Sequence, residues 1–256
     1  MASDVKKIYG LIGYPLIHSF SISFFNRKFE AENIPAEYRN FEIPSIEDFP
    51  ALLASQPLLA GMNVTIPYKE KVIQYLDDLD PLAARAGAVN VIKFVRGKKG
   101  KVLDNCRLIG HNSDVYGFTE SIRPFVNASR RRALVLGTGG ASKAVCVGLD
   151  MLGVEPQLVS RTKRPGILSY ADLSQEIMDD HKIIVNTTPV GMYPHVDKAP
   201  EIPYDLLTPE HLCYDLIYNP DDTRYMQLAR EHGAEVKNGL EMLLLQAFRS
   251  WEIWND

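Results

Sequence analysis

The feature that most constrains the fold of this chain is a short apolar run followed at once by three glycines. Residues 133–136 read Ala-Leu-Val-Leu, which is typical of a buried parallel strand, and Gly137, Gly139 and Gly140 come directly after it. Glycines at this point allow a tight turn and a close approach of the backbone to a diphosphate. The helix expected next would direct free N–H groups and the positive end of its dipole at that anion. The pattern therefore indicates a dinucleotide-binding unit. Ser142 stands at the third small position of the G-x-G-x-x-G pattern, so a tight turn in another kind of α/β protein is the alternative.

A second apolar run, residues 157–160, predicts the next parallel strand, and its end bears on the choice of dinucleotide. NAD-binding sites usually carry an acidic residue about 20 residues past the glycines, where it holds the ribose hydroxyls. Here Ser160, Arg161 and Thr162 occupy that place. A carboxylate would repel a 2′-phosphate, whereas an arginine and a hydroxyl bind one. These residues favour NADP over NAD and, with it, hydride chemistry.

Composition and charge exclude several classes of partner. A chain of 256 residues, 46% hydrophobic and 23% charged, is an ordinary globular sequence that can form one large domain or two modest ones. The net charge of −4 gives no basic footprint for nucleic acid, and no apolar stretch is long enough to span a membrane. We find no secretory signal, and the three cysteines lack metal-ligand spacing. We therefore expect a cytoplasmic protein with reduced thiols and no metal site.

Strand-like runs alternate with helical patterns along the whole chain, which predicts an α/β fold with mostly parallel sheets. We predict two domains, an N-terminal α/β substrate domain (1–113 plus 239–256) and a C-terminal Rossmann-like dinucleotide-binding domain (114–238). The active site is expected in the cleft between them. The predicted strands are 7–12, 38–43, 59–64, 89–95, 107–111, 133–136, 157–160, 183–186 and 213–216. The predicted helices are 21–32, 46–54, 69–76, 81–86, 115–126, 223–232 and 240–254, with a further helix after the glycines.

Four short segments of the first half carry residues suited to chemistry: 13–21, 63–69, 87–90 and 111–114. Ser21 could bind a ligand or simply cap the helix that follows. Lys69 follows a strand end and a proline turn, although a lone lysine is usually a solvated charge. Asp114 could cap the next helix or face Lys69 across a cleft. A Lys–Asp pair suits proton transfer to an alkoxide, because the acid orients the amine.

Taken together and in this order, the segments resemble those of the shikimate dehydrogenase family. Its G-x-P-x-x-H-S-x-S, N-V-T-x-P-x-K and G-A-V-N motifs occur at residues 13–21, 63–69 and 87–90, and its N-T-D-G element corresponds to Asn112-Ser113-Asp114. The second half also matches the family. Its elements are G-x-G-G-A-S at 137–142, N-x-T-P-x-G-M at 186–192, D-x-x-Y at 215–218 and G-L-x-M-L-x-x-Q-A at 239–247. The resemblance therefore covers almost the whole chain.

The resemblance implies reversible reduction of 3-dehydroshikimate to shikimate with NADPH, a step toward the aromatic amino acids. Lys69 and Asp114 would be the catalytic pair, with Lys69 passing the proton to and from the reacting oxygen. The implied substrate-binding residues are Ser19, Ser21, Thr65, Asn90, Tyr218 and Gln246. The implied cofactor-binding residues are Gly137, Gly139, Gly140, Ala141, Arg161, Thr162, Met192 and Gly239. The expected partner is this small molecule alone, bound by a monomer or a homodimer.

The chain departs from the family in places that leave alternatives open. Ile22 and Phe25 stand where the family often has Pro and His, and Ser160 replaces the usual Asn. Residues 161–173 are too few for the crossover helix that relatives carry there, and Arg164-Pro165-Gly166 breaks the pattern. The 2′-phosphate clamp is therefore built differently or is weaker. The alternatives are an enzyme that uses quinate or NAD, and a non-catalytic dinucleotide-binding regulator of the same fold. Retention of Lys69 and Asp114 argues against the regulator.

Overall fold

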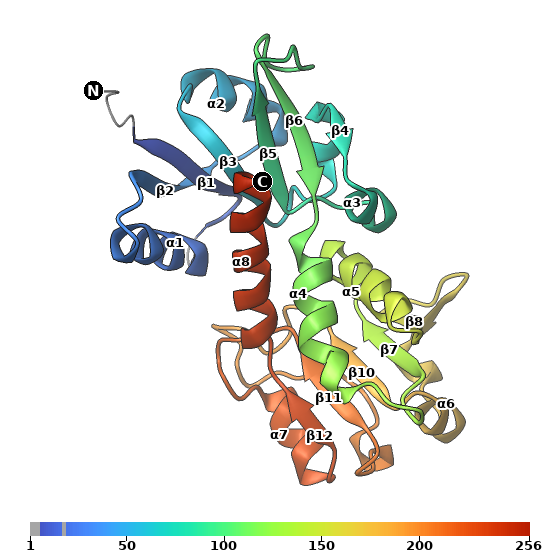
Figure 1. Cartoon of the computed structure of the whole chain (residues 1–256). Coiled ribbons are helices and arrows are strands. Elements are labelled where there is room, and N and C mark those ends of the chain that lie inside the picture. Colours follow the sequence, from blue (N-terminus) through green and yellow to red (C-terminus); the bar gives the residue numbers. More distant parts are fainter. Residues whose placement is uncertain (1–5, 17–18) are drawn as a thin grey trace. The chain divides into compact units, whose positions relative to one another are not determined.

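Two six-stranded sheets organise the chain, each in a unit of its own (Figure 1). The computed structural model describes residues 6–16 and 19–256. Unit 1 comprises the residues up to Ser113 together with Ala247–Asp256, and unit 2 comprises Asp114–Gln246. The fold class is the α/β class that the sequence predicts.

Residues 239–246 belong to unit 2, whereas the sequence analysis assigned them to the first domain. The reason is a close helix contact within unit 2. A Cβ atom at Gly117 would lie 2.6 Å from the Met242 carbonyl oxygen and 3.0 Å from the Gln246 nitrogen. Met242 also packs in the same core as Phe118.

The sheet of unit 1 is mixed, in the order β2-β1-β3-β5-β6-β4. Strand β1 pairs in parallel with β2 and β3, β5 pairs antiparallel with β3 and β6, and the short β4 pairs in parallel with β6. The strands are β1 (Lys7–Gly13), β2 (Ala36–Glu42), β3 (Leu59–Val64), β4 (Asp78–Leu79), β5 (Val91–Arg96) and β6 (Cys106–His111). The helices of this half are α1 (Phe20–Ala31), the 3₁₀ turn Ile46–Asp48, α2 (Phe49–Ser55), the 3₁₀ helix Lys71–Tyr75 and α3 (Pro81–Ala86).

Both faces of this sheet are buried. Along β1, Ile8 and Ile12 contribute to a core with Phe49 of α2. Tyr9 and Leu11 point to the opposite side, where the core includes aromatic side chains of α1 and of α8 (Leu240–Asn255). A strand that is covered on both faces is expected to be apolar at successive positions rather than at alternate ones. The sequence of β1 shows this continuous apolar pattern.

The sheet of unit 2 is parallel throughout, in the order β12-β11-β10-β7-β8-β9. Its strands are β7 (Arg132–Leu136), β8 (Glu155–Ser160), β9 (Ile167–Ser169), β10 (Ile183–Asn186), β11 (Leu212–Asp215) and β12 (Glu235–Lys237). The helices are α4 (Ser113–Ile122), α5 (Gly140–Met151), α6 (Gln175–Asp180) and α7 (Arg224–Glu231), with 3₁₀ turns at Arg123–Phe125, Tyr170–Asp172 and Tyr204–Leu206.

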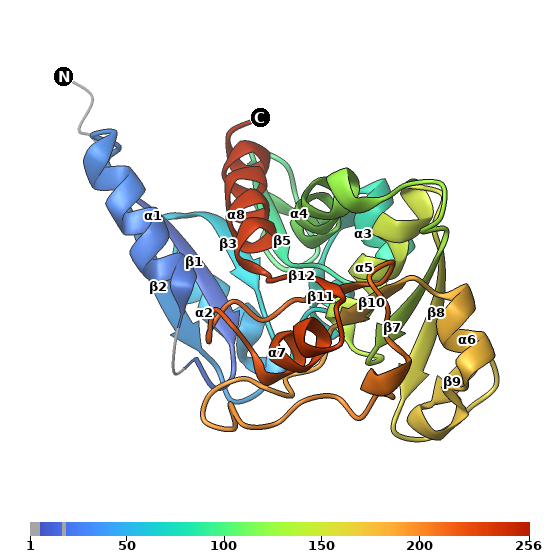
Figure 2. The same ribbon diagram turned by 90° about the horizontal axis from the view of Figure 1, so that it is seen from below.

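Helices cover both faces of this sheet (Figures 1 and 2). Ala133 and Val135 of β7 pack with residues of α4 and α5, whereas Leu134 and Leu136 pack with residues of α6 and α7. The chain runs outward from β7 to β8 and β9 on one side, then returns to β10 on the other. The strand order therefore reverses between β7 and β10, the place where doubly wound sheets bind ligands.

Residues 161–166 alone join β8 to β9, although parallel strands usually need a helical crossover. The connection succeeds because the chain folds back on itself. Arg164 and Ile167 exchange two backbone hydrogen bonds of 3.1 and 2.9 Å across a tight turn. Gln157 Nε2 also donates to the Gly166 carbonyl at 3.0 Å. A short strand thus replaces the crossover helix.

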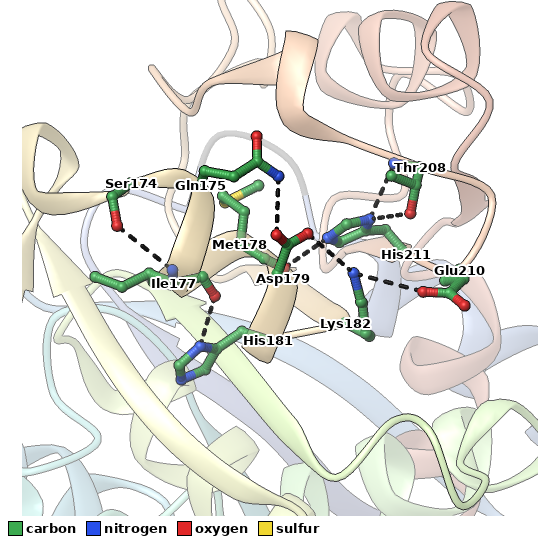
Figure 3. A network of polar contacts seen from close by, with 10 residues as sticks. All are labelled: Ser174, Gln175, Ile177, Met178, Asp179, His181, Lys182, Thr208, Glu210 and His211. Atoms are coloured by element: carbon green, nitrogen blue, oxygen red, sulfur yellow. Dashed lines mark hydrogen bonds and ion pairs between the residues drawn. The ribbon is translucent and has the colours of Figure 1, made fainter.

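The short helix α6 is anchored by a buried histidine (Figure 3). His211 Nε2 lies 2.9 Å from the Met178 carbonyl, and its Nδ1 accepts from the Thr208 amide at 3.0 Å. Since Nδ1 accepts, the proton lies on Nε2, and burial lowers the pKa of the ring. His211 thus satisfies a carbonyl in the last turn of α6 that the helix itself leaves unpaired.

None of the described helices has the length and apolar character needed to cross a bilayer.

Candidate active site

Ser19 and Ser21 stand at the start of α1. Ser19 is the N-cap residue, yet its side chain makes no capping hydrogen bond, and its Oγ is buried with no partner among the described residues. Ser21 lies in the first turn, so the interpretation of Ser21 as the helix cap is wrong. A buried hydroxyl without a partner is the kind of group that a ligand satisfies. Ile17 and His18 of the same motif lie outside the described residues.

Thr65 and Lys69 follow the carboxyl end of β3 in a turn that neighbouring segments hold in place. The Thr65 amide donates to the Ile12 carbonyl at 2.9 Å, and the Lys69 carbonyl accepts from the Val89 amide at 2.7 Å. The second bond also explains why the predicted helix at 69–76 is only a 3₁₀ helix from residue 71. Gly13 makes room for Thr65, since a Cβ atom there would lie 2.5 Å from Thr65 Cγ2. Both functional side chains are half-buried.

Asn90 ends the small-residue turn that follows α3. The turn begins at Gly87, whose φ of 59° caps α3 in the left-handed region. Asn90 is 3% exposed. Its Oδ1 accepts from the Ser113 amide at 2.7 Å, and its Nδ2 donates to Ser113 Oγ at 3.0 Å. Asn90 therefore fixes the start of α4, next to Asp114.

Asp114 lies in the first turn of α4 and is buried. A carboxylate there is favoured by the positive end of the helix dipole. Lys69 belongs to unit 1 and Asp114 is the first residue of unit 2. The pairing of their side chains stays a prediction.

The glycine turn after β7 has the shape that the sequence predicts. Gly137 has φ 113°, and a Cβ atom there would lie 2.7 Å from Thr187 Oγ1 at the end of β10. Gly139 is the N-cap of α5, and a Cβ atom on it would meet nothing within 4 Å. Ser142 at the third position is buried, and its hydroxyl donates to the Gly139 carbonyl at 2.7 Å.

This turn fits a dinucleotide diphosphate. The first residues of α5, Gly140 and Ala141, present backbone N–H groups at a helix N-terminus, and the space beside Gly139 is open. The turn lies at the switch point between β7 and β10, where such ligands bind.

Arg161 and Thr162 follow the end of β8 and are exposed. Ser160 shapes their backbone, because its hydroxyl donates to the Thr162 carbonyl at 2.5 Å. Asp172 also stabilises this segment, because its carboxylate accepts a hydrogen bond from Lys163 Nζ at 2.7 Å. That contact lowers the pKa of Asp172 to about 2. The segment is thus held in shape without a crossover helix, and its exposed arginine and hydroxyl suit a phosphate.

Asp215, which begins the D-x-x-Y element, holds the ends of two strands together. It is fully buried and accepts from Asn186 Nδ2 at 3.0 Å and from Thr223 Oγ1 at 2.7 Å. Burial raises the pKa of Asp215 to about 6 although these hydrogen bonds oppose the rise. Tyr218 follows; it is half-buried, and burial raises its pKa.

The remaining predicted residues lie on the later segments of unit 2. Gly239 cannot carry a side chain, because a Cβ atom would lie 2.0 Å from the Leu216 carbonyl oxygen. Met192 follows Gly191 and is 45% exposed. Gln246 is half-buried on α8 and donates from Nε2 to the Leu243 carbonyl at 2.9 Å.

Sequence reasoning missed a buried polar cluster in unit 1. Tyr38, Asn63 and Ser250 connect by side-chain hydrogen bonds to Asn90 and Ser113. Asn63 belongs to a motif that the sequence analysis singled out, but Tyr38 and Ser250 sit in apolar strand and helix patterns that give no signal of their own.

These features define the class of protein. Unit 2 is a doubly wound parallel sheet with a glycine turn at its switch point, the architecture of a Rossmann-type dinucleotide-binding domain, and unit 1 is a second α/β unit. Residues 11–92 match the model of the shikimate dehydrogenase substrate binding domain. The chain is 37% identical to the shikimate dehydrogenase (NADP(+)) of Aquifex aeolicus, over 100% of this chain and 93% of that protein. It is 38% identical to the Clostridium beijerinckii protein of the same name, over 98% and 92%.

A solved structure shares the fold. Shikimate 5-dehydrogenase from Thermus thermophilus, in complex with NADP(H) and shikimate, superposes with a TM-score of 0.82 at 30% identity, over 97% of this chain and 93% of that one. The chain therefore belongs to the shikimate dehydrogenase family.

Proposed function

We propose that the protein is an NADP-dependent shikimate dehydrogenase, an oxidoreductase that interconverts 3-dehydroshikimate and shikimate in the pathway to the aromatic amino acids. The observation that carries this proposal is the family match along nearly the whole chain. The chain also keeps Lys69, Asp114 and the polar residues of each substrate motif.

The substrate side of the proposal rests on hydrogen-bonding capacity. Ser19 and Ser21 would bind the substrate carboxylate, and the buried Ser19 hydroxyl, which has no partner among the described residues, is available to donate to it. Thr65, Asn90 and Gln246 would hold substrate hydroxyls or the carboxylate. Tyr218 would line the site with its half-buried ring.

Lys69 would carry the proton. When the reacting carbonyl is reduced, negative charge develops on its oxygen, and a neighbouring ammonium both stabilises that charge and donates the proton. In the reverse direction the neutral amine takes the proton from the substrate hydroxyl. Asp114 would orient the Lys69 amine.

NADP would supply the hydride chemistry when bound. Gly137, Gly139, Gly140 and Ala141 would hold its diphosphate at the N-terminus of α5, and Met192 and Gly239 would lie near the nicotinamide. Arg161 and Thr162 would take the 2′-phosphate. The Arg161→Asp variant tests that last assignment. We expect the Kd for NADP to rise about 10-fold or more and the Kd for NAD to change little, because only NADP carries the 2′-phosphate. Equal losses for both would remove Arg161 from that site.

The decisive experiment for the function is a matrix of assays on the purified protein. Reduction of NADP and of NAD is followed by near-ultraviolet absorbance with shikimate and then with quinate. We expect fast turnover with shikimate and NADP. Preferential turnover with quinate or NAD would show that the proposed specificity is wrong and that the proposed reaction class is right. No turnover with any pair of substrate and cofactor would contradict the proposed enzymatic activity and favour a dinucleotide-binding regulator.

A further inference from the structure

Unit 1 contains a buried polar network of which only Asn90 is proposed to contact the substrate. Its members are Tyr38 on β2, Asn63 on β3, Asn90 in the turn before β5, Ser113 at the start of α4, and Ser250 on α8. Each is at most 6% exposed. Buried polar side chains of this kind impose one arrangement on a core, since each must keep its partners.

The first arm of the network joins Asn63 to Tyr38, and a backbone carbonyl fixes the direction of its hydrogen bonds. Asn63 Nδ2 lies 3.1 Å from the Asn90 carbonyl oxygen, which can only accept, so the Asn63 amide has one permitted orientation. Its Oδ1 therefore faces Tyr38, and the Tyr38 hydroxyl must donate to it, at 2.8 Å. This arm thus links the Tyr38 hydroxyl, through Asn63, to the backbone of Asn90, a predicted substrate-binding residue.

The second arm joins Ser113 to Asn90, whose side-chain amide is predicted to bind the substrate. Ser113 Oγ accepts from Asn90 Nδ2 at 3.0 Å, and the Ser113 amide donates to Asn90 Oδ1 at 2.7 Å. Both polar atoms of the Asn90 side-chain amide, Oδ1 and Nδ2, are therefore hydrogen-bonded to one residue, Ser113. Ser113 is also the residue next to Asp114.

The two arms meet at Ser250. Its Oγ accepts from Asn63 Nδ2 at 3.1 Å and shares a hydrogen bond of 3.1 Å with Ser113 Oγ. Ser250 is fully buried, and it comes from a helix 187 residues further along the chain than Asn63. A methyl group in its place would leave each arm with one partner fewer.

We propose that Ser250 is a positioning residue for the substrate: it joins Asn63 to Ser113 and so fixes Asn90 before shikimate binds. This inference rests on the proposed function. Pre-organised polar groups bind a ligand more tightly, because less side-chain ordering remains to be done on binding. Tyr38 and Asn63 act in the same way through the first arm.

The test is Ser250→Ala. We expect the KM and the calorimetric Kd for shikimate to rise about 3- to 10-fold, because Asn63 and Ser113 each lose a buried hydrogen-bond partner and Asn90 must then be ordered on binding. The KM for NADP and kcat should stay within about twofold, since the network lies in unit 1 and leaves the reacting groups in place. Tyr38→Phe removes one hydroxyl from the first arm and should raise the shikimate KM in the same sense.

Ser121→Ala is the matched control. Ser121 is equally buried and also hydrogen-bonds another hydroxyl, that of Tyr214 at 2.7 Å, but it belongs to unit 2 and lies outside the network. It should lower the Tm as Ser250→Ala does and leave the shikimate KM unchanged.

The outcomes separate the possible failures. If Ser250→Ala loses thermal stability like the control yet keeps the wild-type shikimate KM and Kd, the residue is only structural and the inference is wrong. If Ser250→Ala does not fold, an unchanged shikimate KM in Tyr38→Phe overturns it. If the wild-type protein neither turns over nor binds shikimate, the proposed function itself has failed.

Discussion

At the scale of single residues, Lys69 bears the chemical step of the proposed reaction. Its position is set by the backbone hydrogen bond between residue 69 and the Val89 amide, which ties the turn after β3 to the turn before β5. A turn fixed in this way holds the Lys69 backbone in one place, so that only the half-buried side chain has to be ordered for proton transfer.

Lys69→Ala should therefore lower kcat by about 10²-fold or more, with a smaller effect on the shikimate KM. Steady-state kinetics of the purified variant provides the measurement. Lys71→Ala, which removes an exposed lysine from the adjacent 3₁₀ helix, is the control. Near-normal turnover of Lys69→Ala would show that another group carries the proton.

His211 supplies a second prediction, on stability against pH. Because burial lowers its pKa in the folded protein, the unfolded chain binds a proton more readily than the folded one does. The contribution of His211 is present above the unfolded pKa of about 6.5 and is lost as the pH falls through the lower folded value.

Lowering the pH from 7.5 to 5 should therefore reduce the Tm of the wild type more than that of His211→Gln, by about 2–4 °C for each kcal/mol of lost stability. The comparison isolates His211 from Asp215, whose raised pKa of about 6 acts with the opposite sign: its contribution is lost as the pH rises through 6. Parallel pH curves for the two proteins would contradict this role of His211.

At the scale of elements, the turn between β7 and α5 contains one glycine that the fold requires and one that a bound diphosphate would require. Gly137 has a left-handed φ and a close neighbour in Thr187, so any side chain there strains the apoprotein. Gly139 has an ordinary φ of −90° and open space around it. Its lack of a side chain serves the space in front of α5, where the diphosphate would lie.

Gly139→Ser should accordingly keep the Tm within a few degrees, since serine is a good N-cap residue, while the Kd for NADP rises about 10-fold or more. Gly137→Ala should lower both the Tm and NADP affinity. Thermal unfolding and binding titrations distinguish the two. Unchanged NADP binding in Gly139→Ser would place the diphosphate elsewhere.

Most strands and helices were predicted within a few residues of their observed bounds, and four short ones were missed. The strand at Leu59–Val64 and the helix at Pro81–Ala86 have the predicted bounds. No pattern in the sequence indicated β4, β9, β12 or α6, which have at most six residues. Elements this short hold too few side chains for a periodic pattern and form because neighbours supply their hydrogen bonds.

At the scale of the whole molecule, each unit has its own core, and α8 contributes to both. Met242 packs in unit 2, whereas Ala247, Ile253 and Trp254 pack in unit 1. Trp254 lies against Gly61, where a Cβ atom would come within 2.4 Å of the indole ring. Its Nε1 donates to the Ile92 carbonyl at 3.1 Å.

Trp254→Ala should cost about 3–5 kcal/mol of stability, as truncation of a large buried aromatic does. The Kd for NADP should nevertheless stay within about twofold at temperatures where the variant is folded, because every residue proposed to hold NADP lies in unit 2. Denaturant unfolding and NADP titration measure the two effects. A parallel loss of NADP affinity would contradict this assignment of the cofactor to unit 2.

The sequence by itself determined the fold class, the glycine turn and the order of the motifs, because these depend on residues close together in the chain. Gly137 could be singled out from its local pattern, whereas Ser19 and Thr65 were implied by the resemblance to the family. The tertiary structure decided that residues 239–246 belong to unit 2, that a short strand replaces the crossover helix, and that Ser250 joins Asn63 to Ser113. Each of these depends on contacts between segments far apart in sequence, and such contacts leave no periodic trace in either segment.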